Sequence, residues 1–158
     1  MGESLSTRAH RWAFNLFPAY RGTGARITYI AGDWREVRLC VPLSWRTRNY
    51  VGTIFGGSMY AAVDPIYMLM LIKNLGPGCI VWDKAATIRF KKPGRSTLHA
   101  RFTLDEPELA AIRAALADRP VTDREYVIEL VDSVGIVHAT IDKTVHVRRA
   151  DKRRAPAA

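Results

Sequence analysis

Six segments of the chain have residue patterns that predict β-strands. The clearest is residues 97–104, where Leu98, Ala100, Phe102 and Leu104 fall on one face and polar residues fall on the other. Such alternation indicates a strand with one buried face. The six predicted strands cover residues 25–31, 36–41, 80–91, 97–104, 124–131 and 136–147.

Three segments have the composition or the periodicity of helices. Residues 58–75 are rich in Met, Ala, Tyr and Leu, and their length and composition predict a helix that is buried on most sides. Residues 107–117 begin with a proline and carry an apolar stripe at helical spacing. A shorter helix over residues 7–17 places Trp12 and Leu16 near one face, and the proline that follows ends it.

The order of these elements is α-β-β-α-β-β-α-β-β. Consecutive strands lie close together in the sequence, so the sheet is predicted to be mostly antiparallel. The long apolar helix needs cover on nearly all sides, and a curved sheet wrapped around it provides that cover. We therefore predict an α+β fold in one domain, residues 1–147. A parallel βαβ fold fits less well, because the helices do not alternate with single strands.

Composition limits the class of protein. The chain has 158 residues, of which 48% are hydrophobic and 25% charged, as expected for one globular domain. The two cysteines, Cys40 and Cys79, are too few for a disulfide framework and lack the spacing of a zinc site, so no metal is expected. The sequence shows no secretion signal, and we expect a cytoplasmic protein.

The net charge of +9 favours anionic partners. Residues 148–158 hold five basic side chains and one acid. We interpret this segment as a solvated, disordered tail. Nucleic-acid or membrane contact through the tail is an alternative that we do not favour.

Two adjacent glycines, Gly56 and Gly57, open the predicted central helix. The first amides of a helix have no helical acceptor and lie at the positive end of the dipole, so they can hold a carbonyl oxygen or an oxyanion. The alternative is that the glycines only give the preceding loop its conformational freedom.

Asp64 is the only acidic residue between Glu36 and Asp83 and lies in an apolar run. A carboxylate is expensive to bury there, and it could serve as a general base or a nucleophile. Because Pro65 follows, Asp64 could instead cap a helix that starts at the proline. The residue pattern alone slightly favours the cap.

Basic side chains around Lys91 and Lys92 form a compact patch at a predicted strand end. They could hold the phosphates of a nucleotide-like group, or they could simply be solvated. The histidines on the predicted strands, His99, His138 and His146, fall on the polar-facing sides and are expected to face solvent.

The glycine pair and the aspartate belong to a longer pattern, which resembles the signature of hotdog-fold acyl-CoA thioesterases of the phenylacetate-pathway type. That signature has an asparagine, five residues, His-Gly-Gly, and an aspartate nine positions after the histidine. Here Asn49 lies six positions before Phe55, Gly56 and Gly57 follow, and Asp64 lies nine positions after Phe55. The sequence is most similar to a less characterised thioesterase-like branch with Phe-Gly-Gly.

The resemblance implies a hotdog fold over roughly residues 24–147 and hydrolysis of an acyl thioester. It implies that Asp64 activates water or attacks the thioester, that the N–H of Gly56 polarises the carbonyl, and that Asn49 positions substrate or water. The implied substrate is an acyl-CoA or an acyl-carrier thioester. Coenzyme A would enter only as part of the substrate, and no separate cofactor is implied.

The resemblance also implies a homo-oligomer, a dimer or a dimer of dimers, with each active site at a subunit interface. Asp64 would then face Gly56 and Asn49 of the partner chain. The expected substrate-binding residues are Gly57, Phe55, Asp83, Met59, Lys91 and Lys92. The acyl groove is expected to be lined in part by Met59, Tyr60, Val63 and Met68.

Two departures from the signature define an alternative function. Phe55 replaces the usual histidine and cannot form a hydrogen bond, and Pro65 follows the aspartate. A protein that keeps the apolar groove without the chemistry, a non-catalytic acyl or acyl-CoA-binding protein, is the alternative. Hotdog dehydratases generally use a histidine, and this stretch contains none.

Overall fold

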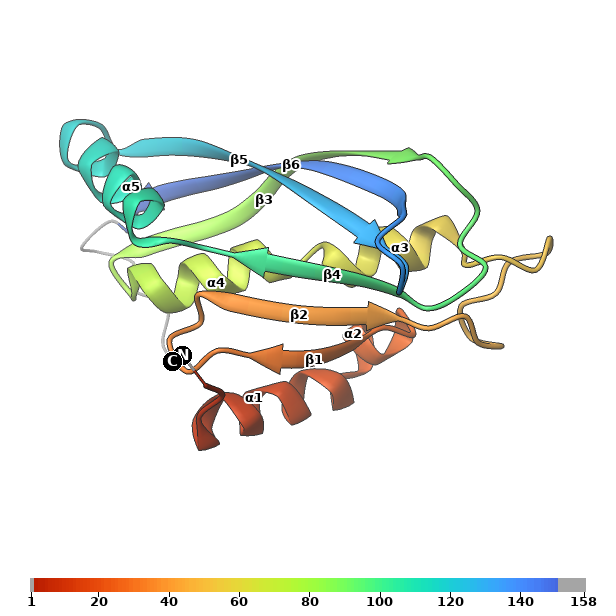
Figure 1. The fold of residues 1–158 in the computed structure, drawn as a ribbon. Helices are drawn as coiled ribbons and strands as arrows, with labels where there is room; N and C mark the ends of the chain where they lie inside the picture. The colour runs from red at the N-terminus through yellow and green to blue at the C-terminus, as the bar shows by residue number, and fades with distance from the viewer. Residues whose placement is uncertain (1, 151–158) are drawn as a thin grey trace.

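A curved antiparallel sheet wraps around two consecutive central helices in the computed structural model, which describes residues 2–150 (Figure 1). This arrangement confirms the predicted α+β fold. The helices are α1 (Leu5–Leu16), α2 (Pro18–Gly22), α3 (Gly56–Val63), α4 (Ile66–Leu75) and α5 (Glu106–Asp118). The strands are β1 (Arg26–Ile30), β2 (Glu36–Val41), β3 (Cys79–Phe90), β4 (Leu98–Thr103), β5 (Val121–Val131) and β6 (Val137–Arg149).

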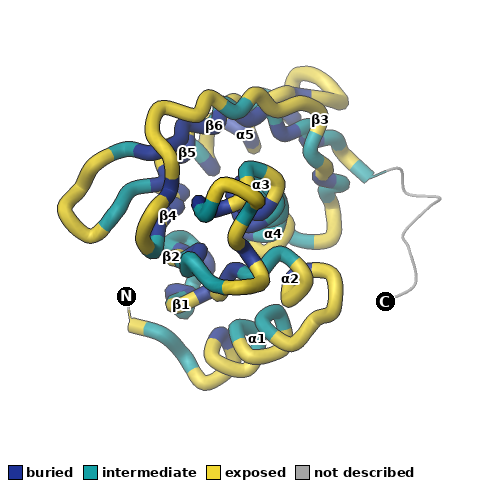
Figure 2. Tube along the Cα trace, turned by 90° about the vertical axis from the view of Figure 1, so that its right-hand side faces the viewer, coloured by how far each residue is buried: buried dark blue, intermediate teal, exposed yellow. Residues whose placement is uncertain are grey.

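The alternation in the sequence correctly predicts which side of the sheet is buried. Leu98, Ala100, Phe102 and Leu104 are each at most 4% exposed and contribute to the core. Figure 2 shows α3 and α4 in the middle of the molecule, with the strands around them and α1 on the outside. No helix within residues 2–150 is long and apolar enough to cross a membrane.

The two edges of the sheet differ in how they are covered. The strand order is β1-β2-β4-β5-β6-β3. Helix α1 packs along β1, where the Asn15 side-chain amide exchanges hydrogen bonds of 2.8 and 2.9 Å with the backbone N–H and C=O of Ile27. Glu3 accepts another from the N–H of Ile30 at 3.3 Å. At the other edge β3 pairs only with β6, and no strand within residues 2–150 covers its outer side.

The predicted helix over residues 58–75 is two helices, separated by Asp64 and Pro65. Proline has no backbone N–H, and its ring clashes with the preceding turn, so a continuous helix is unfavourable here. The ψ angle of Pro65 is −8°, which departs from α-helical geometry. Near the break, the Tyr20 hydroxyl donates to the carbonyl of Ala62 at 3.1 Å, which satisfies one buried acceptor.

A bulge in β3 determines which of its side chains face the central helices. The register with β6 shifts between Asp83 and Ala85. Before the shift Asp83 pairs with Val145, and after it Phe90 pairs with Ala139. Val145 and Ala139 are both fully buried. The bulge therefore places Asp83 and Phe90 on the same inner face, although seven positions would otherwise put them on opposite faces.

Strand β6 extends two residues beyond the predicted end of the domain at residue 147. Strand β6 continues to Arg149, because Arg148 and Arg149 pair with Ile80 and Cys79 at the start of β3. These two basic residues therefore belong to the sheet. The remainder of the predicted tail, residues 151–158, lies outside the described residues.

Candidate functional site

The Asp64 carboxylate is held at the break between α3 and α4 by two side chains. The Tyr60 hydroxyl, one helical turn earlier, donates to Asp64 Oδ1 at 2.8 Å. The Lys143 ammonium donates to the same oxygen at 3.0 Å and also to the backbone carbonyl of Asp64. Burial, together with the hydrogen bond to the Asp64 carboxylate, raises the pKa of Tyr60 to about 12. Tyr60 is therefore a neutral donor at physiological pH.

Lys143 joins a second carboxylate to this group. Its Nζ lies 3.0 Å from Oδ2 of Asp83 on β3. The Lys143 side chain is 0% exposed, and the other oxygen of Asp83, Oδ1, is buried without a hydrogen-bond partner. Burial raises the pKa of Asp83, and the Lys143 ammonium opposes that rise. One buried cation thus lies between two carboxylates from different elements.

Asp64 does not act as the helix cap that the residue pattern slightly favours. The residue before α4 is Pro65, and no side chain forms a capping hydrogen bond there. Asp64 instead uses Oδ1 for Tyr60 and Lys143, and its side chain is 42% exposed. Its second oxygen, Oδ2, accepts no hydrogen bond from residues 2–150. A fixed carboxylate with one open oxygen can accept a proton or attack an electrophile.

An apolar cavity of about 420 Å³ lies beside Asp64. Ligand pockets typically have volumes of this order. Tyr60 and Met68, two of the four residues expected to line the acyl groove, line it. The other two do not: Val63 is fully buried, and Met59 lines a different cavity. Much of the wall comes from α1 and α2, which the sequence analysis did not connect with the site. The contributors from these helices and the residue between them are Phe14, Phe17, Ala19 and Tyr20.

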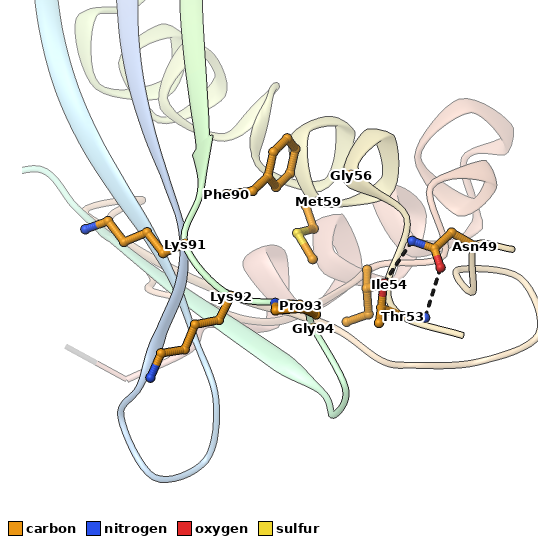
Figure 3. Close-up of a pocket in the computed structure, with 10 residues that line it drawn as sticks. All are labelled: Asn49, Thr53, Ile54, Gly56, Met59, Phe90, Lys91, Lys92, Pro93 and Gly94. Carbon is orange, nitrogen blue, oxygen red and sulfur yellow. Dashed lines mark hydrogen bonds between the residues drawn. The ribbon is translucent and has the colours of Figure 1, made fainter. Parts of the chain in front are cut away.

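The glycine end of α3 lines a second cavity, of about 390 Å³ (Figure 3). Five of the predicted site residues meet there. They are Asn49, Gly56, Met59, Lys91 and Lys92. No side chain caps the start of α3, so its first amides remain available as donors. Figure 3 shows the side chains of Lys91 and Lys92 extending away from Gly56 and Asn49, and an oxygen site at the helix start beside them stays a prediction.

The two glycines are in close contact with aromatic rings. A Cβ at position 56 would lie 2.7 Å from Cζ of Phe90, and one at position 57 would lie 2.3 Å from Cε1 of Phe55. Such distances are too short for carbon atoms, so a side chain at either position would displace a ring. Phe55 itself is 57% exposed and lies at the start of the helix.

Asn49 has a structural role in the loop before α3. Its Nδ2 donates to Thr53 Oγ1 at 2.9 Å, and its Oδ1 accepts from the N–H of Thr53 at 2.9 Å (Figure 3). The side-chain amide therefore closes the loop. A direct role in positioning substrate or water stays a prediction.

The predicted residues form two groups, which lie apart within one chain. Gly56 and Asp64 are at opposite ends of α3, eight residues apart. At about 1.5 Å per residue, that separation is about 12 Å. Asp83 lies with Asp64, through Lys143, whereas the lysine pair lies with Gly56. One small reacting group therefore cannot contact both ends of the helix in the same chain.

His138 is a correction to the expectation that the strand histidines face solvent. It is 7% exposed, and its Nδ1 lies 3.0 Å from the carbonyl of Pro93 while its Nε2 lies 3.1 Å from Asp132 Oδ2. The backbone amides of Lys91 and Lys92 both donate to the carbonyl of His138. His138 thus supports the segment that carries the lysine pair.

The sequence analysis missed Lys143, and it expected Tyr60 only as a wall of the acyl groove and not as a partner of Asp64. Both could have been found from spacing. Lys143 occupies an apolar register of β6, between Ile141 and Val145, where a lysine needs a buried partner. Tyr60 lies four positions before Asp64, which places the two side chains on the same side of a helix.

Within residues 2–150, no group of three or more His, Cys, Asp or Glu side chains could hold a metal ion. The titratable side chains that lie together at Asp64 are Asp83, Lys143 and Tyr60.

The class of protein follows from the fold. A curved antiparallel sheet around a central helix is the hotdog fold, and solved hotdog structures superpose over most of the chain. One is PA5026 from Pseudomonas aeruginosa, a protein of unknown function described as a probable thioesterase, with a TM-score of 0.82, 18% identity, and coverage of 95% of this chain and 100% of that one. A second is thioesterase HI1161 from Haemophilus influenzae, with a TM-score of 0.67, 18% identity, and coverage of 98% and 97%. A third is the PaaI protein of the phenylacetic acid degradation operon of E. coli, with a TM-score of 0.60, 16% identity, and coverage of 90% and 91%.

The chain belongs to the family described as a domain of unknown function, DUF4442, whose model matches residues 6–147. No protein among those with curated descriptions matches the sequence. At identities of 18% and below, the solved structures show the fold, and the chemistry has to be argued from the site.

Proposed function

We propose that the protein hydrolyses an acyl thioester in a site built from two chains. The observation that carries this proposal is the Asp64 carboxylate, which has one oxygen fixed by Lys143 and Tyr60 and the other open beside an apolar cavity. The thioesterase descriptions of PA5026 and HI1161 support the same class of reaction.

The geometry of α3 and β3 supports the second chain of this proposal. The two ends of α3 are complementary in chemistry but about 12 Å apart, so an antiparallel second copy would supply the missing half. The uncovered edge of β3 is where such a copy can add its own β3. A two-fold axis at Thr87 would place Asp83 opposite the partner's Phe90, because the bulge adds one residue between Asp83 and Ala85.

This pairing would bring the two halves of the site together. Phe90 packs where a side chain at Gly56 would lie, and Asp83 shares Lys143 with Asp64. Both residues face the inner side of the sheet because of the bulge. An Asp83–Phe90 pairing across the interface would therefore place Asp64 near the partner's Gly56. The proposed assembly is a dimer with two equivalent sites.

In the proposed reaction, the N–H of the partner's Gly56 holds the thioester carbonyl oxygen at the helix start, where the developing negative charge is stabilised. Oδ2 of Asp64 removes a proton from water, and the water oxygen attacks the carbonyl carbon. The carbon–sulfur bond then breaks, and the proton held by Asp64 passes to the leaving thiolate. The products are a carboxylic acid and a thiol. Direct attack by Oδ2, through an anhydride that water opens, would give the same products.

The two cavities would receive different parts of the substrate. The apolar cavity beside Asp64 suits the acyl group. Lys91 and Lys92 at the Gly56 cavity suit the phosphates of coenzyme A, which would be part of the substrate rather than a cofactor. An acyl-carrier protein could present the same thioester arm, and we favour coenzyme A because a free nucleotide brings more phosphate to these lysines.

The test is thiol release from short, long and aromatic acyl-CoAs by the wild type and by Asp64→Asn. We expect turnover of at least one class, and a loss of at least about 100-fold in the variant. Asp118→Asn, at the end of α5, is the matched control and should keep the wild-type rate. An Asp64→Asn variant with the wild-type rate would contradict the proposal.

Phe55 supports a second candidate function, a non-catalytic acyl or acyl-CoA-binding protein. Its ring occupies the position where thioesterases of this signature have a histidine, and it offers no hydrogen bond. Under this alternative, no acyl-CoA would be hydrolysed by the folded protein, and native mass spectrometry would detect acyl-CoA bound to it. The thioesterase function therefore predicts hydrolysis of at least one acyl-CoA of the set, and the binding function predicts binding without hydrolysis.

A further inference from the structure

Helix α1 presents an apolar stripe to solvent, and the side that faces the protein carries polar residues beside Phe14. Asn15 faces inward, because it bonds the open backbone of β1, and Thr7 on the same side is 1% exposed. The opposite side is an apolar stripe at helical spacing, in which Leu5 is 84%, Trp12 59% and Leu16 62% exposed. Figure 2 shows this helix on the outside of the molecule. The stripe is not used in the core of this chain.

The apolar surface continues beyond the helix. Phe17, between α1 and α2, is 57% exposed, and Trp45, in the loop after β2, is 87% exposed. Trp45 lines the same cavity, of about 690 Å³, as Trp12 and Leu16. We define the α1 face as Leu5, Trp12, Leu16, Phe17 and Trp45. Exposed aromatic and aliphatic side chains on this scale mark an interaction surface.

Arginines outnumber carboxylates around the α1 face within residues 2–150. The cavity between α1 and the Trp45 loop is lined by Arg11, Arg21, Arg26 and Arg46, and no Asp or Glu lines it. Of these, Arg11 is paired with Glu3 at 2.8 Å. The other three form no ion pair with an acidic residue within 2–150. The guanidinium groups of Arg11 and Arg46 each lie 5.8 Å from the ring centre of the neighbouring tryptophan.

We propose that the α1 face docks on an anionic phospholipid membrane, with the helix lying in the interface. An apolar helical stripe flanked by arginines, with tryptophans at its border, is the pattern of helices that lie at the headgroup level of a bilayer. The arginines then face lipid phosphates, and the stripe enters the acyl boundary.

A second copy of this chain is a poorer occupant of the α1 face. A two-fold contact places the same patch on both subunits, so Arg21, Arg26 and Arg46 would approach their own copies with no acidic residue of the patch to pair with them. An anionic surface removes this repulsion. Charge complementarity therefore favours the membrane.

The α1 face lies next to the apolar cavity, so docking would also determine where that cavity meets its substrate. Phe17 belongs to the face and also lines the cavity beside Asp64. A docked molecule would hold that cavity next to the bilayer, where long acyl chains partition. This consequence rests on the proposed function, whereas the docking itself does not.

The docking is tested by sedimentation with vesicles, using the full chain. One set is phosphatidylcholine alone. The other is a three-to-one mixture of phosphatidylcholine and phosphatidylglycerol. We expect binding to the mixed vesicles that weakens between about 0.1 M and 1 M NaCl, because salt screens the arginines. Trp12→Ser/Leu16→Ser should lower the partition coefficient at least about tenfold, since both apolar side chains stay in water. Arg21→Glu/Arg46→Glu should lower it by a similar factor.

Two controls alter equally exposed residues elsewhere. Val127→Ser changes an apolar side chain that is 67% exposed on β5. Arg113→Glu/Arg119→Glu makes the matching charge change on α5 and at the residue that follows it. Both should bind as the wild type does, and circular dichroism should show that all variants are folded. The proposal is overturned if the wild type does not bind the mixed vesicles, or if Trp12→Ser/Leu16→Ser binds unchanged. It is also overturned if size-exclusion chromatography shows that this variant dissociates an oligomer, because the face would then be a contact between copies.

Discussion

The ammonium of Lys143 lies 3.0 Å from Oδ1 of Asp64, at a position of β6 where the residues two before and two after are fully buried and aliphatic. A lysine is tolerated there because two carboxylates surround it. The desolvation of three charged groups is then offset by their mutual attraction and by hydrogen bonds. Substituting one of the three charged residues should therefore change the free energy of unfolding.

Lys143→Met should lower the free energy of unfolding by about 3 kcal/mol or more, because it leaves Asp64 and Asp83 close together without a cation. Urea denaturation of the purified variant measures this change. Lys84→Met is the matched control, since Lys84 is paired with Asp123 on the surface and its side chain is 52% exposed. The control should change stability by at most about 1 kcal/mol. Equal effects of the two substitutions would contradict the buried-cation interpretation.

Asp83→Asn should reveal a pH dependence of definite sign. Burial raises the pKa of Asp83 above its ordinary value of 3.8, so the folded protein binds this proton more tightly than the unfolded chain does. The stability of the wild type, measured relative to the variant, should therefore fall as the pH rises from about 3.8 through the raised native pKa, and stay constant above it. Urea denaturation of both proteins across this range provides the comparison. A difference that grows in favour of the wild type with rising pH would show that the Lys143 interaction outweighs the desolvation.

Tyr60→Phe should reduce turnover about tenfold and leave KM nearly unchanged, because it removes one of the two donors that fix Asp64 Oδ1 and keeps the wall of the cavity. Steady-state kinetics on whichever acyl-CoA the wild type hydrolyses best gives both parameters. Tyr50→Phe, at a fully exposed position, serves as the control. A rise in KM at constant kcat would assign Tyr60 to substrate binding instead.

Gly24→Ala should destabilise the protein more than Gly52→Ala. Both glycines have a positive φ, 77° and 81°, where an alanine costs about 1 kcal/mol. At Gly24 the new Cβ would also lie 2.3 Å from Cγ2 of the buried Thr47, whereas nothing lies within 4 Å of one at Gly52. The collision should add about 1–3 kcal/mol. Thermal or urea unfolding of the two variants checks this difference, and equal losses would show that Thr47 can move aside.

The sequence predicts the elements whose register is set by burial. The alternation of Leu98, Ala100, Phe102 and Leu104 identifies both the strand and its inner face, because a shift by one residue would expose all four side chains. The position of the central helix is predicted correctly, but its division into α3 and α4 is not. Local composition did not show how completely Pro65 would divide it, since that depends on whether other groups satisfy the freed carbonyls.

The site is predicted where its chemistry is local and missed where it depends on tertiary contacts. Gly56 and the lysine pair line one cavity, because a helix start and a strand end carry them. The partners of Asp64 could not be derived from its neighbours alone, since Lys143 lies 79 residues later. The outward stripe of α1 also has a tertiary cause. An edge strand needs polar partners for its backbone, so the side of the helix that carries Asn15 faces the protein.

The uncovered edge of β3 has a consequence for how the protein must be handled. An isolated chain presents a strand of 12 residues whose outer amides and carbonyls can recruit any extended peptide, including a partly folded copy of itself. The middle of this strand is small and uncharged, and Lys84 and Arg89 are its only basic side chains on either side. These two residues then act as gatekeepers against fibrillar stacking. Replacing both Lys84 and Arg89 with neutral residues should increase aggregation whenever the β3 edge is unpaired, as during dilution, refolding or slow synthesis.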